Sequence, residues 1–376
     1  MSSKFATVDI LEELTEFPTY EERGMKLCSE FLFNGLKSLG FKVEVDELDN
    51  VYGEKEFDGD EDPFLVNSHF DTVQSTPRWT RNPLKASLED DRLYGLGASD
   101  DKGAVASILH VLDKLKDCRF RKLEVLFSNY EDNSTMVGGE TWRGTPYFLS
   151  HHKLESKSGI NVEGTVKDAR LAVSIGCGGR VGFTVTTLGK EAHSSDPRQG
   201  HNAIYDMMKV IDALRQLPPA RMTLEGQEAY TELNVSKIQG GIAMNIVPGE
   251  CTITCERRVL PNENWDTVKG KVDETLGKVK DVNFKTSYMN PQKSYLVDKT
   301  HPAVTLAKVS VQRTLGYTPE LRVESGRTDS TYLNEAGIKT AIMGPGETAH
   351  IADEYINIKR LEEFSRVLYQ MLSKTG

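Results

Sequence analysis

Three short apolar stretches, each ending in polar or acidic residues, constrain the fold of this chain most strongly. They are FLVNSHFDT at 64–72, LEVLFSNYED at 123–132 and SGINVEGT at 158–165. Short apolar runs separated by helical patterns are typical of strands buried inside a parallel sheet. Because ligands collect at the carboxyl ends of such strands, the polar ends predict where a functional site lies.

Helical patterns alternate with these strands along the chain. In the segment 103–117, for example, Val105, Ile108 and Leu112 fall on one helical face. Strands that alternate with helices predict the α/β class, with a largely parallel sheet flanked by helices. Further helical patterns lie at 8–17, 24–40, 301–316 and 361–374.

The pattern changes in the middle of the chain. From about residue 178 the expected elements follow the order β-α-β-β-α-β, ending with the strand VNFKTSYM at 282–289. This order matches the ferredoxin-like pattern and could fold as a unit. We therefore predict a discontinuous catalytic domain, residues 1–177 and 291–376, with a smaller α+β domain, residues 178–290, inserted into it.

Length and composition agree with a two-domain cytoplasmic protein. A chain of 376 residues exceeds the size at which single cores stop growing. The formal net charge of −10 is spread along the chain, which argues against nucleic acid or an anionic membrane as a partner. The start lacks a signal-peptide pattern, no apolar run approaches ~18 residues, and the five scattered cysteines indicate reduced thiols.

Ligand-type side chains gather at the predicted strand ends and in the loops that follow them. Imidazoles together with several carboxylates are the ligand mixture of a hydrolytic zinc site. A carboxylate that bridges two ions would let five ligands hold a pair of metals. The candidates are His69, Asp71, Asp100, Asp101, Glu131, Asp132, Glu163 and His350.

Each candidate also has a structural explanation when it is taken alone. A lone histidine at a strand end is usually a hydrogen-bonded structural residue. Asp100 or Asp101 could cap the helix that follows them. Glu131 and Asp132 could form a solvated strand end, and Glu163 could belong to a turn. Ligand types at four separate strand ends or following loops favour a metal site over coincidence.

Spacing within the pairs adds a further expectation. Residues i and i+2 of an extended segment share a face, so Asp71 can lie near the imidazole of His69 and fix its tautomer. The adjacent side chains of Glu131 and Asp132 diverge. One of them can therefore bind a metal while the other stays free as a general base.

Seven motifs in one order resemble a known family. They are SHFDTV, RWTRNPL, DRLYGLGASDDKG, YED, VEGT, EAHSSDPRQGHNAI and GPGETAHIADEY. The chain resembles the dinuclear zinc amidohydrolases that include acetylornithine deacetylase, succinyl-diaminopimelate desuccinylase, aminoacylase and glutamate carboxypeptidase. The resemblance covers nearly the whole chain and is greatest, in RWTRNP and LYGLG, to acetylornithine deacetylase. It implies a zinc-exopeptidase-like catalytic domain.

The resemblance also implies how the metal ligands are divided. His69, Asp100 and Glu163 would bind one divalent ion. Asp100, Asp132 and His350 would bind the other, with Asp100 bridging the two. The ions would be zinc, with cobalt as an alternative.

Further roles follow only from the resemblance. Asp71 would orient His69, and Glu131 would be the general base that takes a proton from the attacking water and returns it to the leaving amine. The inserted domain would act as a lid and dimerise, so that its His193 reaches the active site of the partner in a homodimer. Asn245 and Arg258 resemble lid residues that bind a substrate carboxylate. Taken alone, His193 could be a loop histidine, Asn245 a turn residue and Arg258 a solvated strand charge.

Two departures from the family pattern bear on the site. The family usually has Asp-Glu-Glu where this chain has Tyr130, Glu131 and Asp132, so the expected ligand of the second ion is one methylene shorter. Relatives often carry a run of glycines where this chain has SGRTDS at 325–330. Arg327 there could pair with a second anionic group of the substrate, or it could be an ordinary surface arginine.

The leading hypothesis is a metal-dependent hydrolase of amino-acid biosynthesis that cleaves the amide bond of an N-acyl amino acid, as acetylornithine deacetylase does. Within the same family, the alternatives are a dipeptidase, a carboxypeptidase, a desuccinylase, or a hydrolase that frees an amino acid from a carrier protein. A hypothesis from another class is a catalytically silent relative kept as a binding protein, which only the substitutions at 130 and 132 support.

Overall fold

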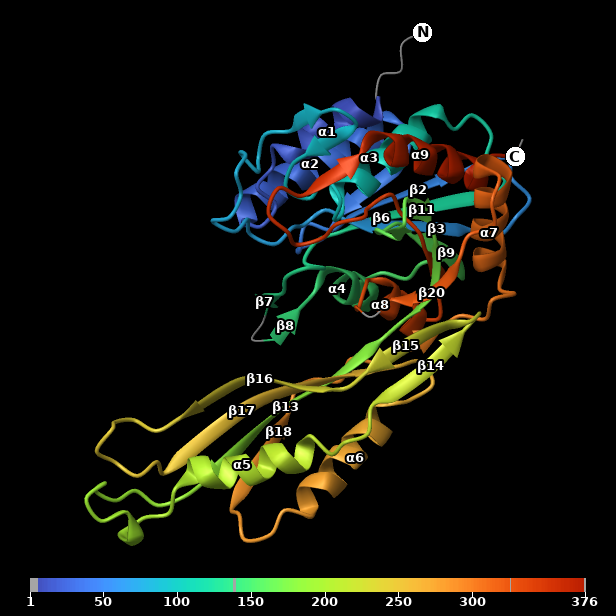
Figure 1. The fold of residues 1–376 in the computed structure, drawn as a ribbon. Coiled ribbons are helices and arrows are strands. Elements are labelled where there is room, and N and C mark those ends of the chain that lie inside the picture. Colours follow the sequence, from blue (N-terminus) through green and yellow to red (C-terminus); the bar gives the residue numbers. More distant parts are fainter. Residues whose placement is uncertain (1–5, 138–139, 325, 375–376) are drawn as a thin grey trace. The chain divides into compact units, whose positions relative to one another are not determined.

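A computed structural model describes residues 6–137, 140–324 and 326–374 of the chain. The chain divides into two compact units (Figure 1). The domain boundaries drawn from the sequence, and the lid role of the insert, stay predictions. Unit 1 comprises Met1–Ile175, Val297–Arg322 and Thr328–Gly376, and unit 2 comprises Gly176–Leu296 and Val323–Arg327.

The main sheet is mixed, with a parallel centre and antiparallel edges. Its strand order is β1-β2-β6-β3-β9-β21-β12-β19, and β20 also pairs with β12. The pairs β6–β3, β3–β9 and β9–β21 are parallel, whereas the pairs nearer the edges are antiparallel. The predicted α/β class with a largely parallel sheet is confirmed. The strands are β1 Lys42–Val45, β2 Val51–Glu56, β3 Phe64–His69, β6 Lys122–Ser128, β9 Ser158–Asn161, β12 Val173–Cys177, β19 Tyr295–Leu296, β20 Leu321–Glu324 and β21 Lys339–Ile342.

Strand register brings the polar strand ends to one edge of this sheet. Every residue of β3 and β6 is buried, as expected for strands covered on both faces. His69 at the end of β3 pairs with Ser128 at the end of β6, and Asn67 pairs with Asn161 at the end of β9. The residues that follow these strands therefore leave the sheet at the same edge.

Helices cover both faces of the sheet. In Figure 1, α1, α2, α3 and α9 lie on one face, and α4 and α8 lie on the other. The predicted apolar stripe of α3 is buried, including Val105, Ile108 and Leu112. Asp101 precedes α3 but makes no side-chain cap, so the capping explanation for Asp101 is wrong. The helices are α1 Thr7–Thr15, α2 Glu22–Ser38, α3 Lys102–Lys114, α4 Gly144–His151, α7 Pro302–Leu315, α8 Ser330–Glu335 and α9 Ile358–Leu372.

Several elements of unit 1 were not expected from the sequence. The strand β2 was missed because it contains Gly53 and three charged residues, and only its first half is buried. Helix α4 was missed because it begins at Gly144 and contains Pro146, both unusual within a helical pattern. The remaining short strands are β4 Ser87–Glu89, β5 Arg92–Tyr94, β7 Thr135–Val137, β8 Glu140–Trp142, β10 Val166–Lys167, β11 Arg170–Leu171 and β22 Tyr355–Asn357.

Unit 2 has the predicted β-α-β-β-α-β order. Its sheet runs β16-β17-β13-β18 with antiparallel neighbours, and a hairpin, β14 and β15, is added between α5 and β16. The strand β16 forms one edge of this sheet. The elements are β13 Gly179–Leu188, a 3-10 turn at Pro197–Gln199, α5 Ala203–Leu214, β14 Ala220–Leu224, β15 Gln227–Thr231, β16 Leu233–Gly240, β17 Glu250–Val259, α6 Trp265–Gly277 and β18 Phe284–Tyr288.

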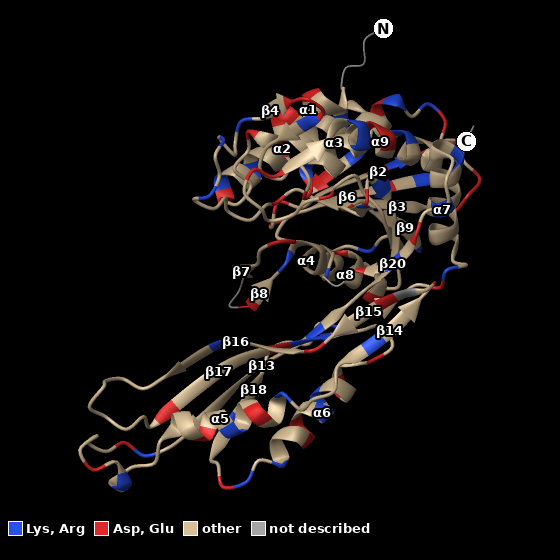
Figure 2. Cartoon of the chain, in the orientation of Figure 1, with Lys and Arg blue, Asp and Glu red and all other residues tan. Residues whose placement is uncertain are grey.

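The surfaces of both units carry mixed charge. Acidic and basic residues are interspersed over the helices and loops of each unit (Figure 2). Over the described part of the chain, we find no helix that combines the length and the apolar character needed to cross a membrane.

The core of unit 2 gives a stability prediction. Phe183 lies on β13, is fully buried, and its ring centroid is 5.5 Å from that of Tyr288. Phe183→Ala should destabilise unit 2 by about 3–5 kcal/mol because it leaves a cavity. Urea unfolding followed by tryptophan fluorescence, to which Trp265 on the same core contributes, measures the change. Thr184→Ala, at the half-buried neighbouring position, should lower the free energy of unfolding much less. Similar losses for both variants would contradict the prediction.

Candidate metal centre

Five ligand-type side chains meet in two overlapping groups at the carboxyl edge of the main sheet. The first group is His69, Asp100 and Glu163, and the second is Asp100, Asp132 and His350. In each group, one potential ligand atom from every residue lies within 4.8 Å of the others. The structure therefore brings together the residues that the sequence nominated as metal ligands, and all of them belong to unit 1.

Asp100 is the member that the two groups share. Its Oδ1 atom lies 3.1 Å from Nε2 of His69, and its Oδ2 atom lies 3.3 Å from Nε2 of His350. Each carboxylate oxygen thus faces a different imidazole. This is the arrangement expected of a carboxylate that bridges two cations.

The remaining ligand-type residues complete the two groups. Nε2 of His350 lies 3.0 Å from Oδ1 of Asp132, and Asn161 donates a hydrogen bond of 3.0 Å to Oε2 of Glu163. His69 is almost fully buried, whereas the side chain of His350 is half exposed. The first group is therefore the more buried of the two, and the second opens toward solvent through His350.

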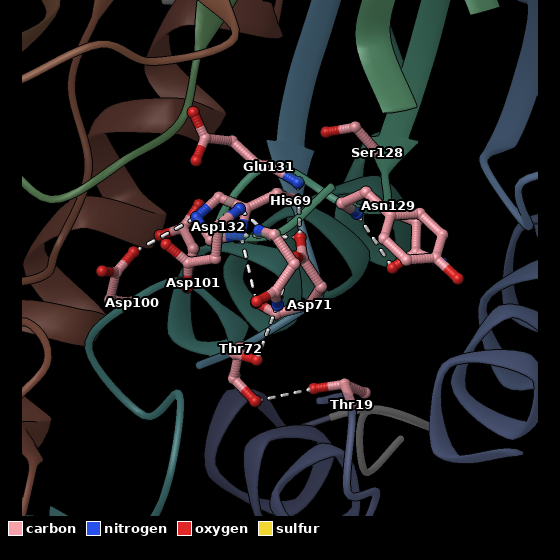
Figure 3. Close-up of polar contacts among 12 residues, drawn as sticks. Thr19, His69, Asp71, Thr72, Asp100, Asp101, Ser128, Asn129, Glu131 and Asp132 are labelled. Carbon is pink, nitrogen blue, oxygen red and sulfur yellow. Dashed lines mark hydrogen bonds and ion pairs between the residues drawn. The ribbon is translucent and has the colours of Figure 1, made fainter. Parts of the chain in front are cut away.

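Asp71 connects His69 to the loop after β6 (Figure 3). Its Oδ1 atom lies 3.4 Å from Nδ1 of His69 and accepts the backbone N–H of Glu131 at 2.9 Å. Its Oδ2 atom accepts the backbone N–H groups of Asp132 and Asn133, at 3.2 and 3.3 Å. The backbone carbonyl oxygen of Asp71 lies nearer to Nδ1 of His69, at 3.1 Å. Asp71 can therefore orient the imidazole through both groups, and its buried carboxylate shapes the loop that carries Glu131 and Asp132.

Glu131 has a different environment from its neighbour Asp132. Figure 3 shows its side chain extending away from Asp71, although its backbone N–H bonds to that residue. The residue is only 6% exposed. The charge of Glu131 also contributes to raising the pKa of Glu163, so the two carboxyl groups lie near each other. Glu131 belongs to neither ligand group.

The electrostatics of the centre favour bound cations. Burial, with a contribution from Glu131, raises the pKa of Glu163 well above its usual range. Burial also raises the pKa of Asp132, and the hydrogen bond to Asp132 raises the pKa of His350 to about 9. Without a cation, the raised pKa values of Glu163, Asp132 and His350 favour bound protons at these three groups. A divalent ion would displace these protons.

The donor set fits divalent metal ions. Carboxylate oxygens and imidazole nitrogens are the ligands that zinc takes in hydrolytic sites. Within the described residues, Oδ2 of Asp132 is buried and has no hydrogen-bond partner, a costly arrangement that a bound cation would relieve. His69, Asp100 and Glu163 would hold one ion, and Asp100, Asp132 and His350 would hold a second.

Ser68 and Asp101 also contribute to this region, although no pattern in the sequence predicts that they pair. The hydroxyl of Ser68 donates a hydrogen bond of 2.7 Å to Oδ2 of Asp101, and both residues are buried. The bond joins the end of β3 to the turn before α3. An acid next to Asp100 was a visible signal in the sequence, but its partner could not be found without the fold.

His193 and Asn245 lie on neighbouring loops of unit 2. Ser194 donates its backbone N–H to the carbonyl oxygen of Asn245 at 3.0 Å, and His193 forms a β-bridge with Ile246. His193 itself is exposed, and its Nδ1 atom lies 2.8 Å from the hydroxyl of Ser195. The structure therefore brings these two predicted residues to the same end of unit 2.

Arg258 lies elsewhere in unit 2. Asn245 precedes Glu250, the first residue of β17, whereas Arg258 is the residue before the last. At about 3.3 Å per residue, Arg258 lies roughly 26 Å along the strand from Glu250. Its Nε atom lies 3.4 Å from Glu256. The neighbouring Arg257 is buried and bound to Glu263 through two hydrogen bonds. Arg258 is thus the arginine at this end of β17 whose side chain remains partly exposed to solvent.

Arg327 is half-buried and belongs to unit 2. In the same motif, Ser325 lies outside the described residues. Asp329 is buried in unit 1 and contacts the hydroxyl of Ser128, at the end of β6. The role of Arg327 toward a substrate stays a prediction.

Comparisons with known proteins identify the family that this chain resembles. Residues 65–374 match the family described as peptidase family M20/M25/M40. An acetylornithine deacetylase from Pectobacterium carotovorum is 27% identical over 352 residues, covering 89% of this chain and 87% of that protein. A succinyl-diaminopimelate desuccinylase from Nitrosospira multiformis is 24% identical over 357 residues, covering 92% and 91%. The structure of an M20 family metallo-carboxypeptidase from Sulfolobus solfataricus shares the fold, with a TM-score of 0.81, 19% identity and coverage of 97% and 98%.

These comparisons and the converging imidazoles and carboxylates define a metal-dependent hydrolase of amide or peptide bonds. The chain belongs to peptidase family M20/M25/M40.

Proposed function

We propose that this enzyme cleaves the amide bond of an N-acyl amino acid, using two divalent ions such as zinc or cobalt. The observation that carries the proposal is the position of Asp100, whose two carboxylate oxygens face His69 and His350 separately. When bound, the ions would supply Lewis-acid polarisation of the scissile carbonyl and lower the pKa of water. The deacetylase and desuccinylase relatives support an acyl amino acid as the substrate class.

In this proposal, Glu131 transfers the proton. Its carboxylate takes a proton from the water that attacks the carbonyl carbon. As the carbon–nitrogen bond breaks, Glu131 gives the proton to the leaving amine. Asp71 supports this step because it accepts the backbone N–H of Glu131 and so fixes the start of that side chain. Asp71 also keeps Nε2 of His69 directed at Asp100, because its backbone carbonyl and its carboxylate both lie near Nδ1.

The substrate-binding groups come from unit 2 in this proposal. His193 would stabilise the developing oxyanion, and Asn245 and Arg258 would bind the carboxylate of the substrate. Asn245 and Arg258 lie near opposite ends of β17, so one chain cannot easily offer both to a small molecule. A homodimer in which two copies contribute to each site resolves this difficulty. Arg327 would pair with a second anionic group of the substrate.

Unit 2 also presents a surface suited to dimerisation. The strand β16 is an edge strand, and its Ile238 side chain is exposed. Ile242 and Met244 follow in the loop after this strand and are exposed as well, Met244 completely. An unpaired strand edge next to apolar side chains favours pairing with another chain. These features support a homodimer formed through unit 2.

A substrate screen on the metal-loaded enzyme tests the proposed function. N-acetylornithine, N-succinyl-diaminopimelate and a panel of dipeptides would each be supplied with zinc or cobalt, and release of the free amine would be measured. We expect the greatest kcat/KM for an acyl amino acid. Rapid dipeptide cleavage without release from any acyl amino acid would overturn the proposed substrate in favour of a peptidase.

The same screen separates an enzyme from a catalytically silent relative. The Glu131→Gln variant serves as the control, because its release of amine shows the background from contaminating enzymes. A chain that binds no metal and releases no amine from any substrate after reconstitution would support the binding protein instead.

A further inference from the structure

Two loops of unit 1 that carry proposed metal ligands are bound to each other by Glu354. The first loop leads to Asp100, and the second carries His350. One oxygen of the Glu354 carboxylate accepts the backbone N–H groups of Ser99 and Asp100, at 2.9 and 3.0 Å. The other oxygen accepts the backbone N–H of Gly97 at 3.1 Å. Glu354, four residues after His350, therefore holds the backbone of Asp100 itself.

Ser99 makes the reciprocal connection. Its hydroxyl oxygen accepts the backbone N–H groups of Glu347 and Thr348, both at 2.9 Å. These two residues precede His350, whereas Glu354 follows it. The loop of His350 is thus attached to the loop of Asp100 on both sides of the histidine. Ser99 and Glu354 are both 2% exposed, so water cannot readily replace these bonds.

His350 needs such support more than the other proposed ligands do. Its backbone φ is 56°, in the left-handed region that residues other than glycine rarely adopt. Its side chain is half exposed, whereas His69, the imidazole of the first group, is almost fully buried. Packing therefore restrains His350 weakly, and the backbone of its loop must provide the restraint.

We propose that Glu354 and Ser99 are positioning residues that set the metal affinity of the second ligand group, Asp100, Asp132 and His350. The inference rests on the proposed function, because it takes these three residues as ligands. The two positioning residues touch neither substrate nor metal. They act by fixing the separation between the Asp100 and His350 backbones, so that binding a cation need not first order a loop.

Glu354→Gln tests this proposal with a change of nearly identical size. The glutamine carbonyl oxygen can still accept the N–H groups of Ser99 and Asp100. Its NH₂ group then faces the N–H of Gly97, where a donor replaces an acceptor. We expect the Co²⁺ affinity of the second ligand group to fall about 10–100-fold, as is typical when the partners of a metal ligand are lost. Ser99→Ala removes the acceptor of the Glu347 and Thr348 N–H groups, so it should lower the Co²⁺ affinity of the same group.

The measurement is a calorimetric titration of the full-length apoprotein with Co²⁺, together with the visible absorption of the bound ion. Both report binding without reference to activity. Glu124→Gln is the matched control. Glu124 is also buried and accepts two backbone N–H groups, from Glu155 and Ser156, but it lies on β6 away from both loops. It should lower the melting temperature without changing the Co²⁺ affinity.

His350→Ala separates failure of this inference from failure of the proposed function. If His350→Ala leaves Co²⁺ binding unchanged, the ligand assignment is wrong and the proposed function fails with it. If His350→Ala weakens one site but Glu354→Gln and Ser99→Ala do not, the positioning role alone is overturned. Equal losses of Co²⁺ affinity in Glu354→Gln and Glu124→Gln would also overturn it, because both would then reflect general destabilisation.

Discussion

Replacing Glu131 by glutamine is expected to reduce turnover by about 10²–10⁴-fold while the protein keeps its metal content. Glutamine has the size of glutamate but cannot accept a proton from water at neutral pH. Glu131 lies outside both ligand groups, so its loss should leave the metal ligands in place. Its backbone N–H would still bond to Asp71, which preserves the loop.

The measurement pairs kcat for the best substrate of the screen with metal analysis of the same sample. Glu124→Gln, a buried glutamate outside the centre, should keep its turnover within a few fold. An unchanged kcat in Glu131→Gln would remove this residue from the proton-transfer role. A parallel loss of metal and turnover would instead indicate that Glu131 is a ligand.

Asp100→Ala should abolish high-affinity binding of both ions, because this carboxylate belongs to both ligand groups. We expect turnover to fall by about 10³-fold or more, since several kcal/mol of transition-state stabilisation would be lost with the ions. Removal of the metals from the unaltered enzyme by a chelator should produce the same loss. Readdition of zinc or cobalt should restore activity to the unaltered enzyme and not to Asp100→Ala.

The comparison with Glu163→Ala shows whether Asp100 contributes to the binding of both ions. Glu163 belongs to one group only, so its loss should lower the binding affinity for one ion and leave the affinity for the other unchanged. The number of ions bound per chain, measured after dialysis against a fixed zinc concentration, distinguishes the two variants. An Asp100→Ala protein that retains one tightly bound ion would contradict the bridging position.

The carboxyl edge of the sheet could be predicted from the sequence because strand ends follow simple rules. Apolar runs that end in His69, Asp132 and Glu163 indicated parallel strands, and the carboxyl ends of parallel strands lie at one edge. Asp71 could be paired with His69 because alternate residues of an extended segment share a face.

Other features depend on contacts that no local pattern contains. The bonds from Asp71 to three successive N–H groups arise only when β3 and β6 lie side by side. Those from Glu354 to the loop of Asp100 join segments more than 250 residues apart. The strand β2 was missed because charge and glycine mask its alternation. The separation of Asn245 from Arg258 follows from the length of β17.

The way the chain leaves and re-enters unit 1 bears on how such enzymes can diversify. The backbone N–H of Val297 donates to the carbonyl oxygen of Ile175 at 2.7 Å, and β12 pairs directly with β19. The exit and the return are thus neighbours in the sheet. The long segment between them can change in length or sequence while its two anchor points stay fixed, and none of the proposed metal ligands lies within it. This segment can therefore evolve in one part of the gene while the proposed metal ligands and Glu131, encoded on either side, stay the same.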